Sequence, residues 1–248
     1  MSKDSGGKRV LLMLSGGRDS FLSACHLISN GFFVYMVTYD NGCMSCSSNA
    51  MEVAKRIIHR FGSNKAQYVG IHMIAQNINP LMKQALYSSP IELCKDYPHL
   101  LMYQLRCLAC HTAMYLHSIA FCKVYGIDYL SEGARKQQKF FVELPEMKQR
   151  YEKLCKNYDL NLIMPVYNLE SDVQRKLELA EWGFLPKSYE PQCWIGCPME
   201  QSLSNDQLQS LTKYYDNEIE PILNDIIDRL IEKKKLKDIC GELHFDYE

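Results

Sequence analysis

Two adjacent glycines, Gly16 and Gly17, separate a short apolar run from a helical pattern. The run covers residues 10–14 and is bounded by glycine on both sides, which is typical of a buried strand. Glycines let the backbone turn tightly and approach an anion without an intervening side chain. The start of the following helix offers unpaired N–H groups and the positive end of its dipole. The segment Ser15 to Ser20, SGGRDS, is therefore predicted to bind a phosphate group.

The polar side chains of this segment have different expected roles. Ser15 and Ser20 can donate hydroxyl hydrogen bonds to phosphate oxygens. Asp19 would repel a phosphate, so we expect it to act at the helix N-terminus or in Mg²⁺ binding. Arg18 and the two glycines complete the predicted phosphate-binding set.

Short apolar runs alternate with helical patterns beyond this segment, and a helical pattern occupies the last part of the chain. Strands are expected over residues 10–14, 32–39, 66–72, 127–130 and 162–166. Helices are expected over residues 21–29, 49–61, 79–87, 110–125, 145–157, 171–182 and 204–235, with a kink near Pro221. This alternation predicts an α/β fold with a doubly wound parallel sheet. We expect one domain over residues 1–200 and a helical C-terminal extension over residues 201–248.

The SGGRDS segment matches the Ser-Gly-Gly-x-Asp-Ser motif of the PP-loop ATP pyrophosphatases, so the chain resembles that superfamily. The resemblance implies a fold of the adenine nucleotide α-hydrolase type, with ATP and Mg²⁺ as cofactors. It also implies that a substrate oxygen attacks the α-phosphate of ATP and releases pyrophosphate. Sulfur or nitrogen can then replace the adenylated oxygen, which has become a good leaving group.

The same resemblance assigns further nucleotide contacts. Adenine is expected near residues 37–40, where Tyr39 lies at the end of the second strand. Residues 131–135, SEGAR, follow the fourth strand and are similar to the second nucleotide-contacting turn of the superfamily. There Gly133 would allow close backbone approach, and Arg135 could stabilise phosphate charge. A plain surface turn is the alternative for this segment.

The chain has 11 cysteines, an odd number that does not suit a secreted disulfide scaffold. Close pairs in a reducing compartment more often indicate metal binding or sulfur chemistry. Three such pairs are present, Cys43/Cys46, Cys107/Cys110 and Cys193/Cys197. A functional and an inert role are equally open for the first pair. The remaining cysteines are expected to be mostly buried small hydrophobes, namely Cys25, Cys94, Cys122, Cys155 and Cys240.

Cys107 and Cys110 are predicted to lie where a loop enters a helix, where the helix dipole would lower the pKa of a thiol. The segment 193–196, CWIG, is close to a Cys-Phe-Ile-Gly pattern, so the chain is similar to the tRNA-specific 2-thiouridylases. That resemblance implies catalytic roles for Cys110 and Cys193. One would carry a persulfide that attacks the adenylated base, and the other would release the sulfur. The implied partners are ATP, a nucleobase or tRNA substrate, and a sulfur-donor protein.

Other interpretations of the same residues stay open. Cys107, Cys110, Cys193 and Cys197 could together hold a structural Zn²⁺ or a [4Fe–4S] cluster. The closest rival enzyme resembles 7-cyano-7-deazaguanine synthase, in which ammonia replaces the activated oxygen and cysteines hold Zn²⁺. A non-catalytic ATP-binding module is the rival from a different class. His111 receives no role at this stage.

Composition adds little about partners. The formal net charge of −1 is not that of a dedicated nucleic-acid binder, so any RNA contact must depend on a local patch. No apolar run approaches the roughly 18 to 20 residues that span a bilayer. We therefore expect a cytoplasmic protein without a membrane contact; the oligomeric state is not indicated.

Overall fold

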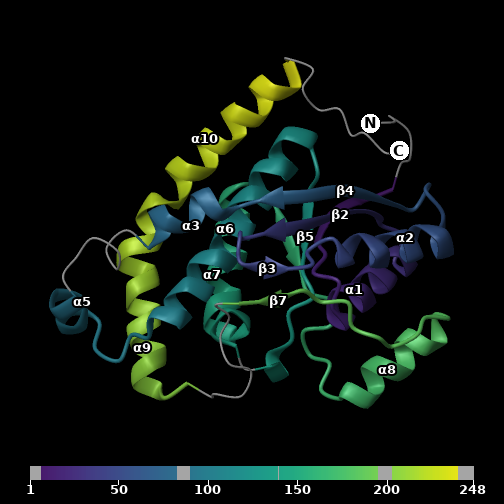
Figure 1. Cartoon of the computed structure of the whole chain (residues 1–248). Helices are drawn as coiled ribbons and strands as arrows, with labels where there is room; N and C mark the ends of the chain where they lie inside the picture. Colours follow the sequence, from purple (N-terminus) through teal and green to yellow (C-terminus); the bar gives the residue numbers. More distant parts are fainter. Residues whose placement is uncertain (1–6, 83–89, 139, 195–202, 240–248) are drawn as a thin grey trace.

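Five parallel strands form the central sheet of the protein (Figure 1). The computed structural model describes residues 7–82, 90–138, 140–194 and 203–239. The strands lie in the order β4-β2-β1-β5-β6. Their bounds are β1 (Arg9–Met13), β2 (Phe33–Asp40), β4 (Ala66–Met73), β5 (Tyr129–Ser131) and β6 (Asn161–Ile163). The chain moves outward from β1 to β4 and then returns to β5, so the predicted doubly wound sheet is confirmed.

Alternate side chains of β1 enter two separate cores. Leu11 and Met13 belong to one buried cluster, whereas Val10 and Leu12 belong to the other. This period of two follows from the pleat of a strand that is covered on both faces. Helices α1 (Arg18–Ser29), α2 (Asn49–Phe61) and α8 (Asp172–Glu181) cover the face of Val10. The other face is covered chiefly by α6 (Met102–Tyr125), α7 (Pro145–Asn157) and α3 (Ala75–Leu81).

Helix α6 is the central helix of the second core, and it begins earlier than the sequence predicts. Its first residue is Met102, eight residues before the expected start at Cys110. Gly126 ends it in the left-handed conformation, with φ 61° and ψ 44°, as the sequence predicts. The short helix α5 (Pro90–Asp96) precedes it. The helix expected over 79–87 is found as α3 at residues 75–81, and residues 83–89 lie outside the described part.

Helix α10 (Glu220–Ile239) packs on α6, and buried residues of α9 (Asn205–Tyr214) extend the same core. A π-helical turn, η3 (Tyr215–Ile219), separates them and ends two residues before Pro221. Proline has no N–H and crowds the carbonyl four residues earlier, which gives the expected irregularity a physical cause. None of the helices in the described part of the chain is long and apolar enough to cross a bilayer.

A small two-stranded ladder was not predicted and matters for the site. Strand β3 (Met44–Ser45) pairs antiparallel with β7 (Gln192–Cys193), with Met44 opposite Cys193. This ladder joins the segment after β2 to a segment about 150 residues further along the chain. Two single-turn 3₁₀ helices, η1 (Lys136–Gln138) and η2 (Phe141–Glu143), lie between β5 and α7.

Candidate functional site

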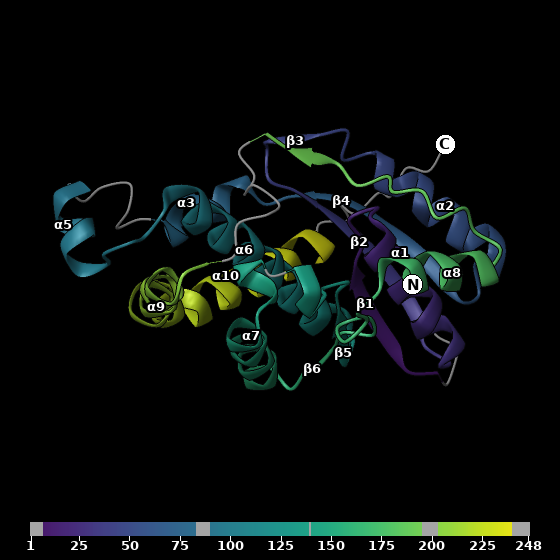
Figure 2. The same ribbon diagram turned by 90° about the horizontal axis from the view of Figure 1, so that it is seen from below.

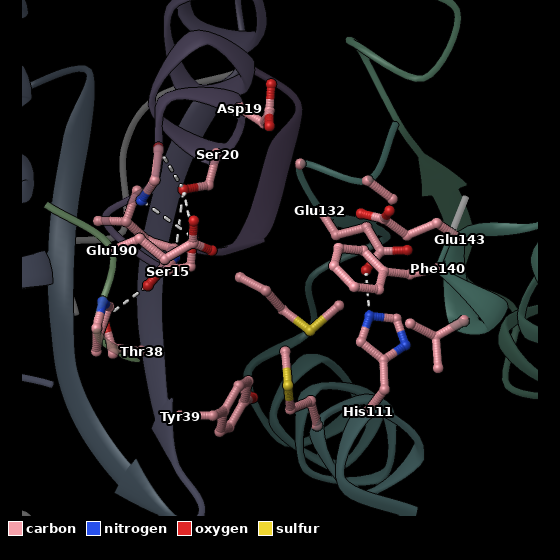
Figure 3. A pocket seen from close by; sticks show the side chains of 18 of the residues that line it. Ser15, Asp19, Ser20, Thr38, Tyr39, His111, Glu132, Phe140, Glu143 and Glu190 are labelled. Atoms are coloured by element: carbon pink, nitrogen blue, oxygen red, sulfur yellow. Dashed lines mark hydrogen bonds and ion pairs between the residues drawn. The ribbon is translucent and has the colours of Figure 1, made fainter. Parts of the chain in front are cut away.

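A cavity of about 290 Å³ opens where β1, β2 and β5 end (Figure 3). Ligands bind at this edge in doubly wound sheets, outside the carboxyl ends of the strands at the switch point. The phosphate loop, the end of β2, the turn after β5 and one side of α6 each supply part of the wall. Ser15 and Ser20 come from the phosphate loop, and Thr38 and Tyr39 come from the end of β2. Glu132 and Gly133 come from the turn after β5, and His111 and Met114 come from α6.

Internal hydrogen bonds shape the phosphate loop. The Ser20 Oγ accepts from the backbone N–H of Ser15 at 3.2 Å and donates to the carbonyl of Gly17 at 3.1 Å. Gly16 has φ +86°, a left-handed conformation that favours glycine. Gly17 is the N-cap of α1 and supplies no side-chain hydrogen bond. The first turn of α1 is therefore free of a side-chain cap, as an anion-binding helix start requires.

Asp19 is held by cations from two distant elements. Arg135 places Nε 2.8 Å from its Oδ1, and Arg175 on α8 places Nη1 2.6 Å from its Oδ2. Gln138 adds a hydrogen bond of 2.9 Å. These contacts are between protein groups, and the roles expected for Asp19 at Mg²⁺ and for Arg135 at phosphate stay predictions. The contacts tie the start of α1 to the turn after β5 and to α8, because both oxygens of the carboxylate are engaged.

Gly133 lies close against the backbone of Asp19 and Ser20 in the phosphate loop. A Cβ at this position would lie 2.4 Å from the backbone nitrogen of Ser20 and 2.7 Å from its Cα. The turn after β5 is therefore packed directly against the first turn of α1. Gly133 also lines the cavity, so its predicted contact with a nucleotide stays a prediction beside this observed packing.

Carboxyl groups that the sequence did not single out line the same cavity. Glu132 pairs with His111, Oε2 to Nε2 at 3.0 Å, and also accepts a hydrogen bond from the hydroxyl of Tyr115. Burial and the nearby charge of Glu132 raise the pKa of Glu143 well above its usual range. His111 directly follows Cys110 in the chain, but nothing in the sequence indicated that its ring would meet Glu132.

Glu190 stands beside the phosphate loop. A Cβ placed on Gly17 would lie 2.9 Å from its Oε2, and the neighbouring Tyr189 donates its backbone N–H to the carbonyl of Gly16 at 3.0 Å. Desolvation and the charge of Asp19 raise the pKa of Glu190 above its usual value. An ionised Glu190 would repel a bound triphosphate, so this side chain competes with the ligand for the loop.

Two cysteines from distant parts of the chain meet at one amide. The Nδ2 of Asn41, the residue after β2, lies 3.3 Å from the Sγ of Cys110 and 3.7 Å from the Sγ of Cys193. Cys43 joins them, because its backbone carbonyl accepts from the N–H of Trp194 at 3.0 Å and its thiol lies 3.2 Å from Arg106. The ladder of β3 and β7 fixes this meeting.

Cys110 lies inside α6 and not at its start, which corrects the sequence prediction. Eight residues of helix precede it, so the dipole of the N-terminus is too far away to lower its pKa. Burial raises the pKa of the Cys110 thiol, although the hydrogen bond from Asn41 opposes the shift. Cys107 is half-buried on the same helix, and Cys46 is exposed. Cys25, Cys122 and Cys155 are buried as predicted; Cys197 and Cys240 and the side chain of Cys94 lie outside the described residues.

Of the four cysteines predicted to hold a metal ion, the structure describes Cys107, Cys110 and Cys193, whereas Cys197 lies outside the described residues. Within residues 7–82, 90–138, 140–194 and 203–239, no three His, Cys, Asp or Glu side chains are grouped as metal ligands. The amide group of Asn41 also presents N–H donors to both sulfurs, and the positive end of this dipole would repel a cation. We therefore derive no step through zinc or an iron–sulfur cluster.

The thiol pair and the cavity share their supporting elements. The end of β2 carries Tyr39 in the cavity wall and Asn41 at the thiols. Helix α6 carries Cys110 at the thiols and His111 in the wall. Met44 lines the cavity and is paired with Cys193 in the small ladder. Cys110 and Cys193 are not among the residues that line the cavity, but each is joined to it by a residue that is: His111 follows Cys110 in the chain, and Met44 pairs with Cys193.

No protein-family model and no curated protein matches this sequence. Solved structures do match. A 4-thiouridine synthetase, solved in complex with RNA and bound ATP, aligns with a TM-score of 0.58 at 14% identity over 92% of this chain. The chain therefore shares the fold of this synthetase. It spans 54% of the length of that synthetase.

Two further structures are similar over most of the chain. The U34-tRNA thiolase NcsA from Methanococcus maripaludis, solved with its [4Fe–4S] cluster, has a TM-score of 0.49 at 14% identity. The alignment covers 91% of this chain and 71% of NcsA. The NMN synthetase from Francisella tularensis has a TM-score of 0.38 at 10% identity, over 86% of each chain. The likeness to the 4-thiouridine synthetase, at 14% identity, shows the fold alone, and the activity must be argued from the site.

Proposed function

We propose that this protein uses ATP to adenylate a carbonyl oxygen of an RNA nucleobase and then replaces that oxygen with sulfur. The observation that carries the proposal is the position of Cys110 and Cys193. Both thiols contact Asn41, which directly follows the strand that lines the cavity beside the phosphate loop. An enzyme that only cleaved ATP would not need two thiols at this place.

The first step activates the base. The triphosphate would lie on the loop of Ser15 to Ser20, with the N–H groups of the first turn of α1 directed at its oxygens. Bound Mg²⁺ would neutralise phosphate charge. The carbonyl oxygen of a ring amide, –NH–C(=O)–, attacks the α-phosphate. Pyrophosphate leaves and the ring nitrogen loses its proton, for which we assign the His111–Glu132 pair as the acceptor. The product is an –N=C–O–AMP group.

The second step transfers sulfur. A sulfur-donor protein supplies one sulfane sulfur, so that one of the two cysteines becomes a persulfide. The terminal sulfur of Cys–S–S⁻ attacks the activated carbon, and AMP leaves with the oxygen. The thiolate of the second cysteine then attacks the cysteine sulfur of the resulting Cys–S–S–C bond. This releases the thiocarbonyl base and leaves a Cys110–Cys193 disulfide, which an external thiol must reduce.

Replacement of single cysteines tests the proposal. Cys110→Ser and Cys193→Ser should each abolish formation of thiolated nucleoside, measured by mass spectrometry of digested tRNA. Each should retain ATP binding and pyrophosphate release that depends on the RNA. Cys46→Ser is the matched control, because Cys46 also belongs to a close cysteine pair but is exposed.

Three results would count against sulfur transfer by these thiols. Thiolation that persists in both variants would exclude the persulfide. Pyrophosphate release with a deazapurine acid and ammonia, together with stoichiometric zinc, would favour the nitrile-forming alternative. Absence of pyrophosphate release with every RNA and deazapurine would leave an ATP-binding module.

A further inference from the structure

The segment between α8 and β7 runs along helix α2 at the surface of the protein. Figure 2 shows it passing from α8 beside α2 to the β3–β7 ladder. Its Tyr189 is anchored to the phosphate loop by the hydrogen bond to Gly16. Its last described residue is Trp194, whose backbone is anchored to Cys43. The segment therefore connects the ATP site to the thiol site along one face.

Trp194 is the most exposed large apolar side chain in the described part of the chain, at 82%. The hydrogen bond of its N–H to Cys43 anchors its backbone beside the small ladder. Trp194 follows the last residue of β7 in a turn. Its exposed indole is one residue from Cys193, a proposed sulfur carrier whose thiol contacts Asn41.

Cations gather at the other end of the same segment. A groove of about 490 Å³ between α2 and residues 183–185 is lined by Lys55, Arg56, His59 and Arg60, with Glu52 as its one acidic member. Arg56 also lies over the ring of Tyr189, 4.7 Å from its centroid, and Lys187 lies 5.4 Å from the same centroid. In a chain of net charge −1, this is a local excess of positive charge.

We propose that this face, the α2 groove together with Trp194, binds a single-stranded segment of the RNA substrate. The α2 cations would contact phosphates, and an unpaired base would stack on the indole. The distance along the chain from Tyr189 to Trp194 is about 17 Å at ~3.3 Å per residue, enough for roughly five stacked nucleotides at ~3.4 Å each. The stacked base would be a neighbour of the base that enters the cavity. The assignment rests on the proposed function, which makes RNA the substrate.

A protein partner is the other occupant to consider, and the chemistry of the face favours RNA. A protein-binding patch is usually depleted in lysine at its centre and enriched in packed apolar groups. Here the exposed indole stands apart from a groove that carries Lys55 and Arg60. Stacking needs an aromatic ring, whereas apolar docking needs only apolar area. Substitutions of Trp194 can therefore separate the two occupants.

Binding of a fluorescently labelled, single-stranded RNA of about 12 nucleotides tests the face without ATP. We expect Trp194→Leu to weaken binding about tenfold and Trp194→Phe to retain most of it, because phenylalanine can still stack on a base whereas leucine cannot. Lys55→Glu should weaken binding about tenfold and reduce the slope of log K against log salt by about 0.7 for each phosphate that is no longer neutralised. The control is Lys156→Glu, an equal charge change at an exposed position of α7, away from α2 (Figure 1).

Intrinsic fluorescence supplies a second readout. The chain has two tryptophans, and Trp182 packs against Phe61 whereas Trp194 is exposed. RNA should therefore quench the wild-type emission, and Trp194→Leu should remove most of the quenching. Thermal melting of each variant within about 2 °C of the wild type would show that the fold is intact.

The proposal is overturned if Trp194→Leu and Lys55→Glu bind the RNA as the wild type does, or if Lys156→Glu weakens binding as much as Lys55→Glu does. It is also overturned if these variants lose activity only with a sulfur-donor protein while RNA binding is unchanged, because a protein then occupies the face. Failure of the proposed function looks different: RNA binds through Trp194 and Lys55, but no thiolated nucleoside forms.

Discussion

Substitution of Gly133 by alanine tests the assembly of the phosphate loop. The added Cβ would lie 2.4 Å from the nitrogen of Ser20, 2.7 Å from its Cα and 2.8 Å from the carbonyl carbon of Asp19. All three are backbone atoms, so no side chain can rotate away. Ordinary contact of about 3.5 Å requires the start of α1 to move by roughly 1 Å.

The expected cost has two parts. Overpacking of a tight site costs about 1–3 kcal/mol, and we expect the upper end because only backbone can yield. A domain of ordinary stability, about 5–15 kcal/mol, would still fold. A displacement of roughly 1 Å in a positioning element can lower a catalytic rate about a hundredfold. Gly133→Ala should therefore lower the free energy of unfolding by about 3 kcal/mol and pyrophosphate release about a hundredfold.

Urea denaturation and pyrophosphate release measure these two parts, with two other glycines as controls. At Gly7 an added Cβ would meet only the carbonyl of Gly31 at 3.5 Å, so Gly7→Ala should be neutral. Gly31 has φ +82° and open space around it, so Gly31→Ala should cost about 1–2 kcal/mol and leave ATP use unchanged. If Gly133→Ala matches Gly7→Ala in both assays, the close packing of the β5 turn on the phosphate loop is refuted.

Three more predictions concern single side chains. Arg175→Leu removes one of the two buried cations that contact the Asp19 carboxylate. It should cost at most about 3 kcal/mol in urea denaturation, because Arg135 still compensates part of the charge; an unchanged midpoint would contradict this. Glu190→Gln should lower the KM for ATP, because it removes a charge that repels the triphosphate. The wild-type KM should fall as pH decreases, since protonation at the raised pKa of Glu190 removes the same repulsion. A higher KM in the variant would instead assign the carboxylate to Mg²⁺. Cys46, which is exposed, should react with iodoacetamide in the folded protein, whereas Cys25 should not; mass spectrometry of both sites checks this. Burial raises the pKa of Cys25 to about 12, whereas a thiol in the unfolded chain has a pKa of about 8.5. The contribution of the buried Cys25 thiol to stability is therefore complete below about pH 8.5 and is lost as pH rises towards 12.

Much of the fold could be predicted because its signals are local. The apolar run of β1 and the two glycines after it lie within a few residues of one another, and so does the stop signal at Gly126. The small ladder of β3 and β7 could not be predicted. Each strand has two residues, too few for a periodic pattern, and the strands pair across about 150 residues.

The start of α6 was misplaced for a related reason. Leu101, the residue before the helix, supplies no capping side chain, so no sequence signal marks the first turn of α6. The cysteines were consequently predicted at a helix N-terminus, with a lowered pKa. The structure places Cys110 within the helix, where burial raises the pKa instead.

The phosphate loop remains the feature that the sequence alone determined, because six adjacent residues and the elements beside them define it. Only the tertiary structure decided which groups surround that loop. Arg175 reaches Asp19 across 156 residues, and Asn41 meets Cys193 across 152. Such contacts depend on which distant segments the sheet and the small ladder bring together, and the spacing of residues along the chain does not encode that. The partners of the loop and the meeting of the thiols therefore became visible only in the folded molecule.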